Sequence, residues 1–123
     1  MPDMPTRIQR RRTKGWRKPE NCVIVTRPSR FGNPFTISGA LENGYGETPE
    51  EARGYAFEAF RSWLRGSETW WMGPRAETTR KRLLDALPEL RGKDLACYCP
   101  LPPEGKPDYC HAAVLLALAN PTP

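Results

Sequence analysis

Two short runs of strand-forming residues stand far apart in the chain, and two helix-like segments lie between them. Residues 21–26 are rich in β-branched side chains and end just before Pro28, which predicts a strand, and residues 94–99 predict a second one. Strands separated by helices usually pair in parallel through a right-handed crossover. The order therefore predicts a small single-domain α/β fold, with a short, mostly parallel sheet flanked by helices.

Between the two predicted strands, the sequence contains a clear signal for the start of a helix. Thr48, Pro49 and Glu51 have the pattern of a capping box with proline in the first turn. Apolar side chains then recur at helical spacing up to residue 64, so a helix is expected there. A second helix is expected over residues 74–87.

The sequence also predicts the bounds of the domain and the structure of its first third. A length of 123 residues suits one domain, expected over residues 7–119, with a flexible leader at 1–6 and a tail at 120–123. Residues 7–10 are expected to form a short edge strand. The apolar run at 21–26 predicts burial on both faces, as in a central strand. Residues 27–46 are predicted to be a loop.

Positive charge is concentrated near the start of the chain. The formal net charge is +5, and residues 7–30 hold nine arginines and lysines against the single acid Glu20. Such a basic segment predicts an anionic partner, a nucleotide or a nucleic acid, although a merely solvated basic tail is the alternative. An aromatic side chain among these cations is suited to base stacking. The candidate nucleic-acid contacts are Arg10, Arg12, Lys14, Trp16, Arg17 and Lys18.

Apolar stretches are short throughout the sequence. None approaches the roughly 20 residues that span a bilayer, and residues 1–5 lack a secretory apolar core. The protein is therefore expected to have no membrane partner, to be cytoplasmic, and to keep its thiols reduced.

Three of the four cysteines and the only histidine fall within residues 97–111. Cys110 and His111 are expected in the first turn of a helix over residues 109–119, where the helix dipole favours a thiolate and attracts phosphate. This predicts a catalytic pair, with Cys97 and Cys99 beside it and no metal. One alternative is a zinc site of Cys97, Cys99, Cys110 and His111. Its spacing is unusual, because two thiols on one strand face stand about 6.5 Å apart. The other alternative is a purely structural role.

A second candidate site follows the first predicted strand. Arg27, Arg30, Gly32 and Asn33 combine two cations, a glycine that permits close backbone approach and an amide, a set suited to binding phosphate or a base. A turn anchored by its phenylalanines is the alternative. If the strands are parallel, this loop and the Cys-His pair follow strand ends at the same sheet edge, where ligands of α/β sheets bind.

Several segments together resemble one family. They are residues 14–19, 27–35, 60–64 and 90–100, followed by Cys110 and His111, and the likeness extends over roughly residues 7–119. The chain resembles domain of unknown function 4326, a family common in phages and bacteria, so a phage-encoded protein would act in the host cytoplasm. The carboxyl end also resembles, locally, domain of unknown function 488. The first resemblance implies functional positions at Gly32, Asn33, Pro34, Cys97, Cys99, Cys110 and His111. Family members often carry Asp where this chain has Ala113.

These patterns favour an enzyme directed at a nucleotide or nucleic acid, of hydrolase or transferase type, or a binder of a phosphate ligand. Its catalytic residues would be Cys110 and His111. Its substrate contacts would be Arg27, Arg30, Gly32, Asn33, Cys97 and Cys99. The alternative function is a non-catalytic nucleic-acid-binding module that is stabilised by zinc.

Overall fold

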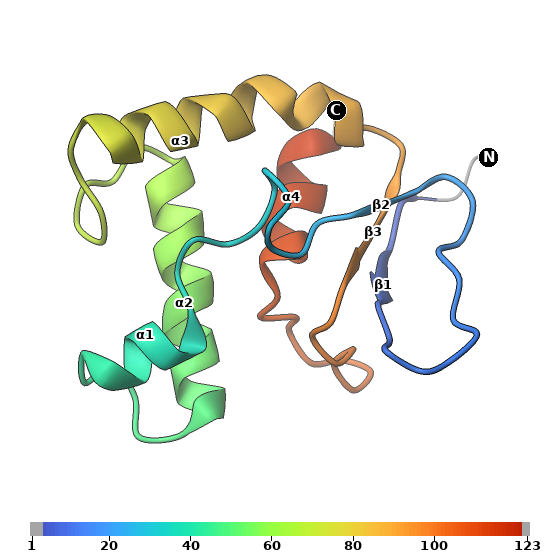
Figure 1. Cartoon of the computed structure of the whole chain (residues 1–123), viewed down its shortest axis with the longest axis horizontal. Coiled ribbons are helices and arrows are strands. Elements are labelled where there is room, and N and C mark those ends of the chain that lie inside the picture. Colours follow the sequence, from blue (N-terminus) through green and yellow to red (C-terminus); the bar gives the residue numbers. More distant parts are fainter. Residues whose placement is uncertain (1–3, 122–123) are drawn as a thin grey trace. The chain divides into compact units, whose positions relative to one another are not determined.

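The computed structural model describes residues 4–121, so the outer parts of the expected leader and tail lie outside the described residues. The chain has a small α/β fold, and it divides into two compact units (Figure 1). The first unit joins the chain up to Gly32 with the chain from Ala86 onwards, and the second runs from Asn33 to Asp85. The sheet and all four cysteines belong to the first unit.

The sheet has three short strands: β1 (Arg7–Gln9), β2 (Cys22–Ile24) and β3 (Asp94–Cys97). Their order is β1-β3-β2, and β3 runs parallel to both neighbours. The prediction of a mostly parallel sheet is therefore confirmed, as is the expected edge strand at the beginning of the domain.

The central position predicted for the strand at residues 21–26 is wrong. The strand found there, β2, lies at an edge of the sheet, and β3 is central. Among the strand residues, β3 has the continuous burial expected of a central strand, since Leu95, Ala96 and Cys97 are all buried. An apolar run indicates only that side chains are covered, whereas hydrogen bonding on two sides decides which strand is central.

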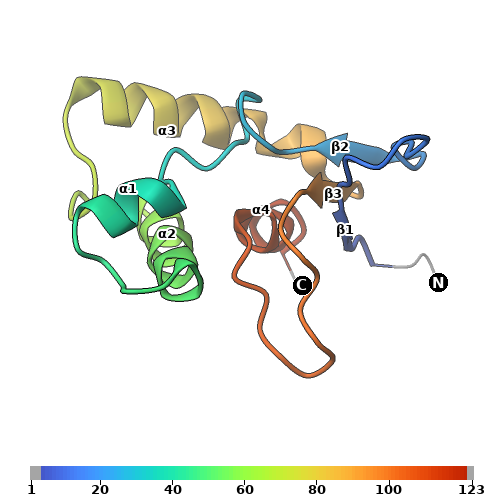
Figure 2. The same cartoon turned by 60° about the horizontal axis from the view of Figure 1, so that its bottom comes forward.

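The last helix, α4 (His111–Ala119), packs against β3, β1 and the 3-10 helix η1 (Leu87–Leu90). The loop that connects β3 to α4 projects away from the sheet, as Figure 2 shows. Leu90, Leu95 and Leu115 are fully buried in this unit. Because α4 begins at His111, two residues later than expected, Cys110 is its N-cap, and its side chain is buried in this core.

The second unit is helical, with α1 (Ile37–Glu42), α2 (Pro49–Leu64) and α3 (Pro74–Ala86). The prediction of a loop over residues 27–46 is wrong at α1. Thr36 caps this helix by accepting a hydrogen bond from the Gly39 backbone N–H at 2.8 Å, and α1 packs on α2. A six-residue helix is too short to show a periodic apolar pattern, so only its cap marked it.

The start of α2 forms as predicted. Thr48 is the N-cap, and its hydroxyl accepts a hydrogen bond from the Glu51 backbone N–H at 3.2 Å. Phe60 and Trp63 are buried on the inner side of α2, and Phe35 and Trp71 contact the Trp63 ring. Within residues 4–121, no helix has both the length and the apolar character needed to cross a bilayer.

Candidate metal centre

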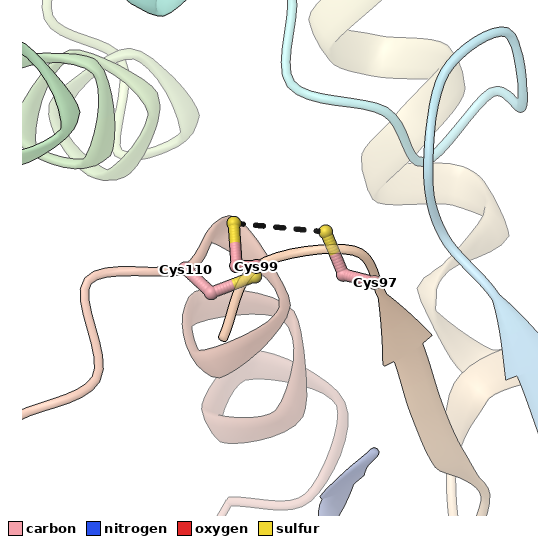
Figure 3. Close-up of side chains that lie close together, drawn as sticks. All are labelled: Cys97, Cys99 and Cys110. Carbon is pink, nitrogen blue, oxygen red and sulfur yellow. Dashed lines mark hydrogen bonds between the residues drawn. The ribbon is translucent and has the colours of Figure 1, made fainter. Parts of the chain in front are cut away.

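Three thiols converge where β3 ends and α4 begins (Figure 3). The sulfurs of Cys97, Cys99 and Cys110 all lie within 4.8 Å of one another, and those of Cys97 and Cys99 are 3.9 Å apart. Tetrahedral zinc with Zn–S bonds of about 2.3 Å requires sulfur–sulfur distances of about 3.8 Å. The three sulfurs thus already have nearly the spacing of a zinc site.

The short distance between Cys97 and Cys99 departs from the spacing expected of two thiols on one strand. That expectation assumed that both residues continue the strand, but β3 ends at Cys97. The backbone bends at Tyr98 and Cys99, and the Cys99 sulfur turns back toward that of Cys97. The unusual C-x-C spacing is therefore compatible with joint metal ligation.

His111 turns one ring nitrogen to the cysteine cluster. Its Nε2 lies 2.8 Å from the backbone carbonyl oxygen of Val25, which follows β2. A carbonyl oxygen only accepts hydrogen bonds, so Nε2 carries a proton, and in the tautomer whose only ring proton is there Nδ1 has a lone pair. Nδ1 lies 3.9 Å from the Cys97 sulfur and 3.8 Å from the Cys110 sulfur. The Val25 carbonyl thus selects the tautomer suited to metal ligation at Nδ1.

Arg7 holds the loop that carries two of the thiols. Its guanidinium donates hydrogen bonds to the carbonyl oxygens of Cys99, at 2.7 Å, and Pro100, at 2.6 Å, and it pairs with the Asp108 carboxylate. Asp108 in turn accepts a hydrogen bond from the Cys110 backbone N–H at 3.2 Å. A single buried side chain from β1 therefore fixes both ends of the loop between Cys99 and Cys110.

The charges of this cluster are coupled. Burial lowers the pKa of Arg7, but the hydrogen bond to Asp108 and the nearby Cys110, Asp108 and Cys99 outweigh it, so the pKa is above its ordinary value. Hydrogen bonds with Cys110 and then Cys99 lower the pKa of Cys97, whereas hydrogen bonds with Cys97 and then Cys99 raise the pKa of Cys110. The neighbouring sulfurs thus oppose a Cys110 thiolate, and the expectation that the helix start favours one stays a prediction.

The loop after β2 uses its predicted contact residues for local structure. Arg30 forms an exposed ion pair with Glu89 and covers the Phe31 ring. Gly32 lies close to Arg27. A Cβ at position 32 would come within 2.7 Å of the Arg27 Cγ. The predicted close backbone approach at Gly32 is thus an approach to the protein's own chain. Their assignment as substrate contacts stays a prediction.

Asn33 belongs to the helical unit and stabilises a turn there. Its side chain donates to the Ala56 carbonyl at 3.2 Å and accepts from the Phe35 backbone N–H at 2.9 Å. Pro34, the other position implied by the resemblance, is exposed and lies in the same turn. A binding role for Asn33 stays a prediction.

The basic N-terminal segment contacts Tyr98, the residue between Cys97 and Cys99 in the sequence. Arg10 and Arg12 place their guanidinium carbons 4.7 Å and 4.2 Å from the centroid of Tyr98, which lies between two of the cysteines. Arg10 also donates to the Thr26 hydroxyl at 2.7 Å. Lys14, Arg17 and Lys18 follow in an exposed loop, with Trp16 half-buried among them.

Several residues of the site were missed by sequence reasoning: Arg7, Asp108, Tyr98 and the Val25 carbonyl. Arg7 was counted only as part of a general basic segment. Asp108 carried a usable signal, because an aspartate two residues before a helix N-cap often accepts a backbone hydrogen bond. The contact with Val25 had no sequence signal, since the two residues are 86 positions apart.

Comparison with known proteins identifies the family but no activity. The family described as "Domain of unknown function (DUF4326)" matches residues 8–121 of the 123-residue chain, so the chain belongs to this family. No curated protein and no solved structure matches the chain.

Proposed function

We propose that this member of the domain of unknown function 4326 family is a nucleic-acid-binding module stabilised by zinc. The observation that carries the proposal is the convergence of three cysteine sulfurs within 4.8 Å of one another, with the Nδ1 of His111 beside two of them. Cys97, Cys99 and Cys110 would ligate the metal, and His111 would be the fourth ligand.

Burial favours a structural metal over a nucleophile. The exposed fractions of Cys110 and His111 are 1% and 7%, so the sulfur presents almost no surface to a substrate. A catalytic thiol has to reach the reacting atom of its substrate, whereas a structural zinc ion is enclosed by its ligands. The cluster therefore suits a closed, four-coordinate site better than an active site.

The donor set also favours zinc over harder cations. Three thiolates and an imidazole are soft or borderline ligands, and zinc sites of the Cys3His type combine the same donors. Three thiolates would give such a site an excess of negative charge. The buried guanidinium of Arg7, close to the cluster, would compensate for part of that charge.

Nucleic acid is the partner that the charge distribution supports. The unit with the cysteines carries twelve arginines and lysines against six acids, whereas the helical unit carries seven against eight. Arg10 and Arg12, which precede the exposed basic loop, contact the Tyr98 ring, and two of the proposed ligands flank Tyr98 in the sequence. Metal binding at Cys97 and Cys99 would therefore order the aromatic and cationic side chains that contact nucleic acid.

The test of the metal site is the zinc content of untagged protein purified under reducing conditions without added metal. We expect about one zinc per chain, lost in Cys110→Ala and retained in the matched variant Cys22→Ala. Cys22 is also buried but lies outside the cluster. Metal-free wild-type protein that stays folded and does not take up zinc would refute the site.

The His111 ligand is tested separately with cobalt in place of zinc. We expect the ligand-field absorption of a tetrahedral cobalt site with three sulfurs and one nitrogen. In His111→Ala the spectrum should change while the sulfur-to-metal charge-transfer band remains. An unchanged ligand-field spectrum would remove His111 from the proposed ligand set.

Nucleic-acid binding is measured with fluorescently labelled single-stranded and duplex oligonucleotides over a range of salt concentrations. We expect affinity to fall steeply with salt and to decrease when the metal is removed by a chelator. If the metal-loaded protein binds neither oligonucleotide at low salt, the nucleic-acid part of the proposal is wrong even where zinc is present.

A further inference from the structure

The helical unit contains a cavity of about 370 Å³, which is within the size range of small-molecule sites. It lies between α1, the middle of α2 and the segment that follows α2. Three aromatic side chains form part of its lining: Tyr45, Tyr55 and Trp70. The proposed function does not involve this cavity.

The three rings contact one another at inclined angles. Their centroids are 5.5 Å apart for Tyr45 and Tyr55, 5.1 Å for Tyr45 and Trp70, and 6.4 Å for Tyr55 and Trp70, with interplanar angles of 47°, 62° and 57°. A group resting on this triangle lies within about 6 Å of all three centroids, the range of a cation–π interaction. Both tyrosines remain 43% exposed, so the rings are not simply core packing.

The backbone fixes Tyr45 against the start of α2. The Tyr45 N–H donates to the Ala40 carbonyl at 2.8 Å, which ties the turn to α1. Gly46 has φ +90°, and a Cβ there would lie 2.9 Å from the Ala52 backbone nitrogen. The turn is therefore in close contact with α2, and the ring position does not depend on a flexible loop.

Charge selects the class of ligand. The cavity lining includes no arginine, lysine, aspartate or glutamate. The helical unit carries eight acids against seven arginines and lysines, and four glutamates lie within residues 33–52, directly before Arg53. A lining without a fixed cation offers no ionic partner to a phosphate, whereas aromatic faces attract a cation.

From the rings, the cavity and the charge together, we infer that Tyr45, Tyr55 and Trp70 form a binding site for an organic cation of the alkylated ammonium type. A cation without N–H donors loses little hydrogen bonding on leaving water and gains the attraction of the ring faces that the cluster leaves exposed. The same chemistry is offered by a free quaternary ammonium compound and by a methylated lysine side chain of another protein. The inference is independent of the zinc site and of nucleic-acid binding.

The test compares choline with its neutral isostere 3,3-dimethylbutanol, using the full-length, metal-loaded protein. Binding is measured by calorimetry and by the shift of the Trp70 indole N–H signal in NMR spectra. We expect choline to bind at least tenfold more tightly than the isostere. Equal binding of the two, binding of neither, or tighter binding of adenosine than of choline would overturn the inference.

Variants link the binding to the rings. Tyr55→Leu keeps the bulk but removes one ring, and we expect choline affinity to fall about tenfold. Tyr55→Phe keeps the ring and should bind as the wild type does. The matched control is Met72→Leu, a change at an exposed apolar residue outside this cavity. If Tyr55→Leu is folded, by its circular dichroism spectrum, and binds as the wild type does, the site is refuted.

A peptide with a trimethyllysine separates the two sources of the ligand. Affinity for this peptide well above that for choline assigns the site to a methylated protein partner. Lower affinity for the peptide assigns it to a free quaternary ammonium compound. An unmethylated peptide of the same sequence should bind more weakly in either case, and binding of equal strength would contradict recognition of the alkylated group.

Discussion

Arg7 and Asp108 form a two-point ion pair although they are 101 positions apart, with the guanidinium Nε and Nη2 facing the two carboxylate oxygens. The side chain of Arg7 is only 4% exposed, and that of Asp108 is 21% exposed. Through this pair, the first strand of the sheet holds the loop that carries Cys99 and precedes Cys110. The geometry of the cysteine cluster therefore depends on a residue that ligates nothing.

Replacing Arg7 by Met should destabilise the protein by about 2 to 4 kcal/mol, because a largely buried carboxylate and two carbonyl oxygens lose their partner. Zinc affinity should also fall by about 10- to 100-fold, as for other groups that position metal ligands. Urea unfolding and competition with a zinc-binding dye measure the two effects. Arg11→Met, at an exposed position, is the control, and an equal effect of both changes would contradict the positioning role.

Neutralising the basic loop should lower the salt dependence of nucleic-acid binding. In the triple variant Lys14→Gln, Arg17→Gln, Lys18→Gln, we expect the slope of log affinity against log salt to decrease by about 2, if each side chain contacts a phosphate of a single strand. The slope is measured by fluorescence anisotropy of a labelled oligonucleotide.

The control for that experiment removes the same charge elsewhere. Arg75, Lys81 and Arg82 are exposed on α3, and their replacement by Gln should leave the slope nearly unchanged. Equal slopes for the two triple variants would show that only net charge matters, and the basic loop would then not be the contact surface.

Gly32→Ala should destabilise the protein by about 1 to 3 kcal/mol, because the new methyl group would lie 2.7 Å from the Arg27 Cγ and 3.0 Å from its Cα. The matched change is Gly54→Ala within α2, where a Cβ meets nothing within 4 Å. That change should instead stabilise the protein by about 0.5 to 1 kcal/mol, because alanine favours the helix. Thermal and urea unfolding measure both, and effects of the same sign would contradict the packing at Gly32.

Thr48→Ala should cost about 1 kcal/mol, because the Glu51 N–H loses its capping hydroxyl at the start of α2. Thr48→Ser should restore most of this stability. The measurement is the midpoint of urea unfolding followed by circular dichroism. Thr78→Ala, at an exposed position within α3, should change stability by less than about 0.5 kcal/mol, and a loss there equal to that at Thr48 would argue against a capping effect.

The features that the sequence predicted correctly depend on local residue patterns or on the order of these patterns along the chain. The capped start of α2 follows from Thr48 and Glu51, three positions apart, and the helix continues through a periodic apolar face. The parallel sheet follows from the order of strands and helices along the chain. The short helix α1 and the central position of β3 were not predicted, because one has no periodic pattern and the other depends on which strands pair.

The sequence by itself determined that three cysteines and a histidine lie near the junction of a strand and a helix, and that positive charge gathers in the first thirty residues. Only the tertiary structure decided what these residues do together. The end of β3 at Cys97 brings the sulfurs close, Val25 sets the tautomer of His111, and Arg7 fixes the loop. Such contacts join residues up to about a hundred positions apart, and they depend on strand register and side-chain direction, which local sequence patterns do not encode.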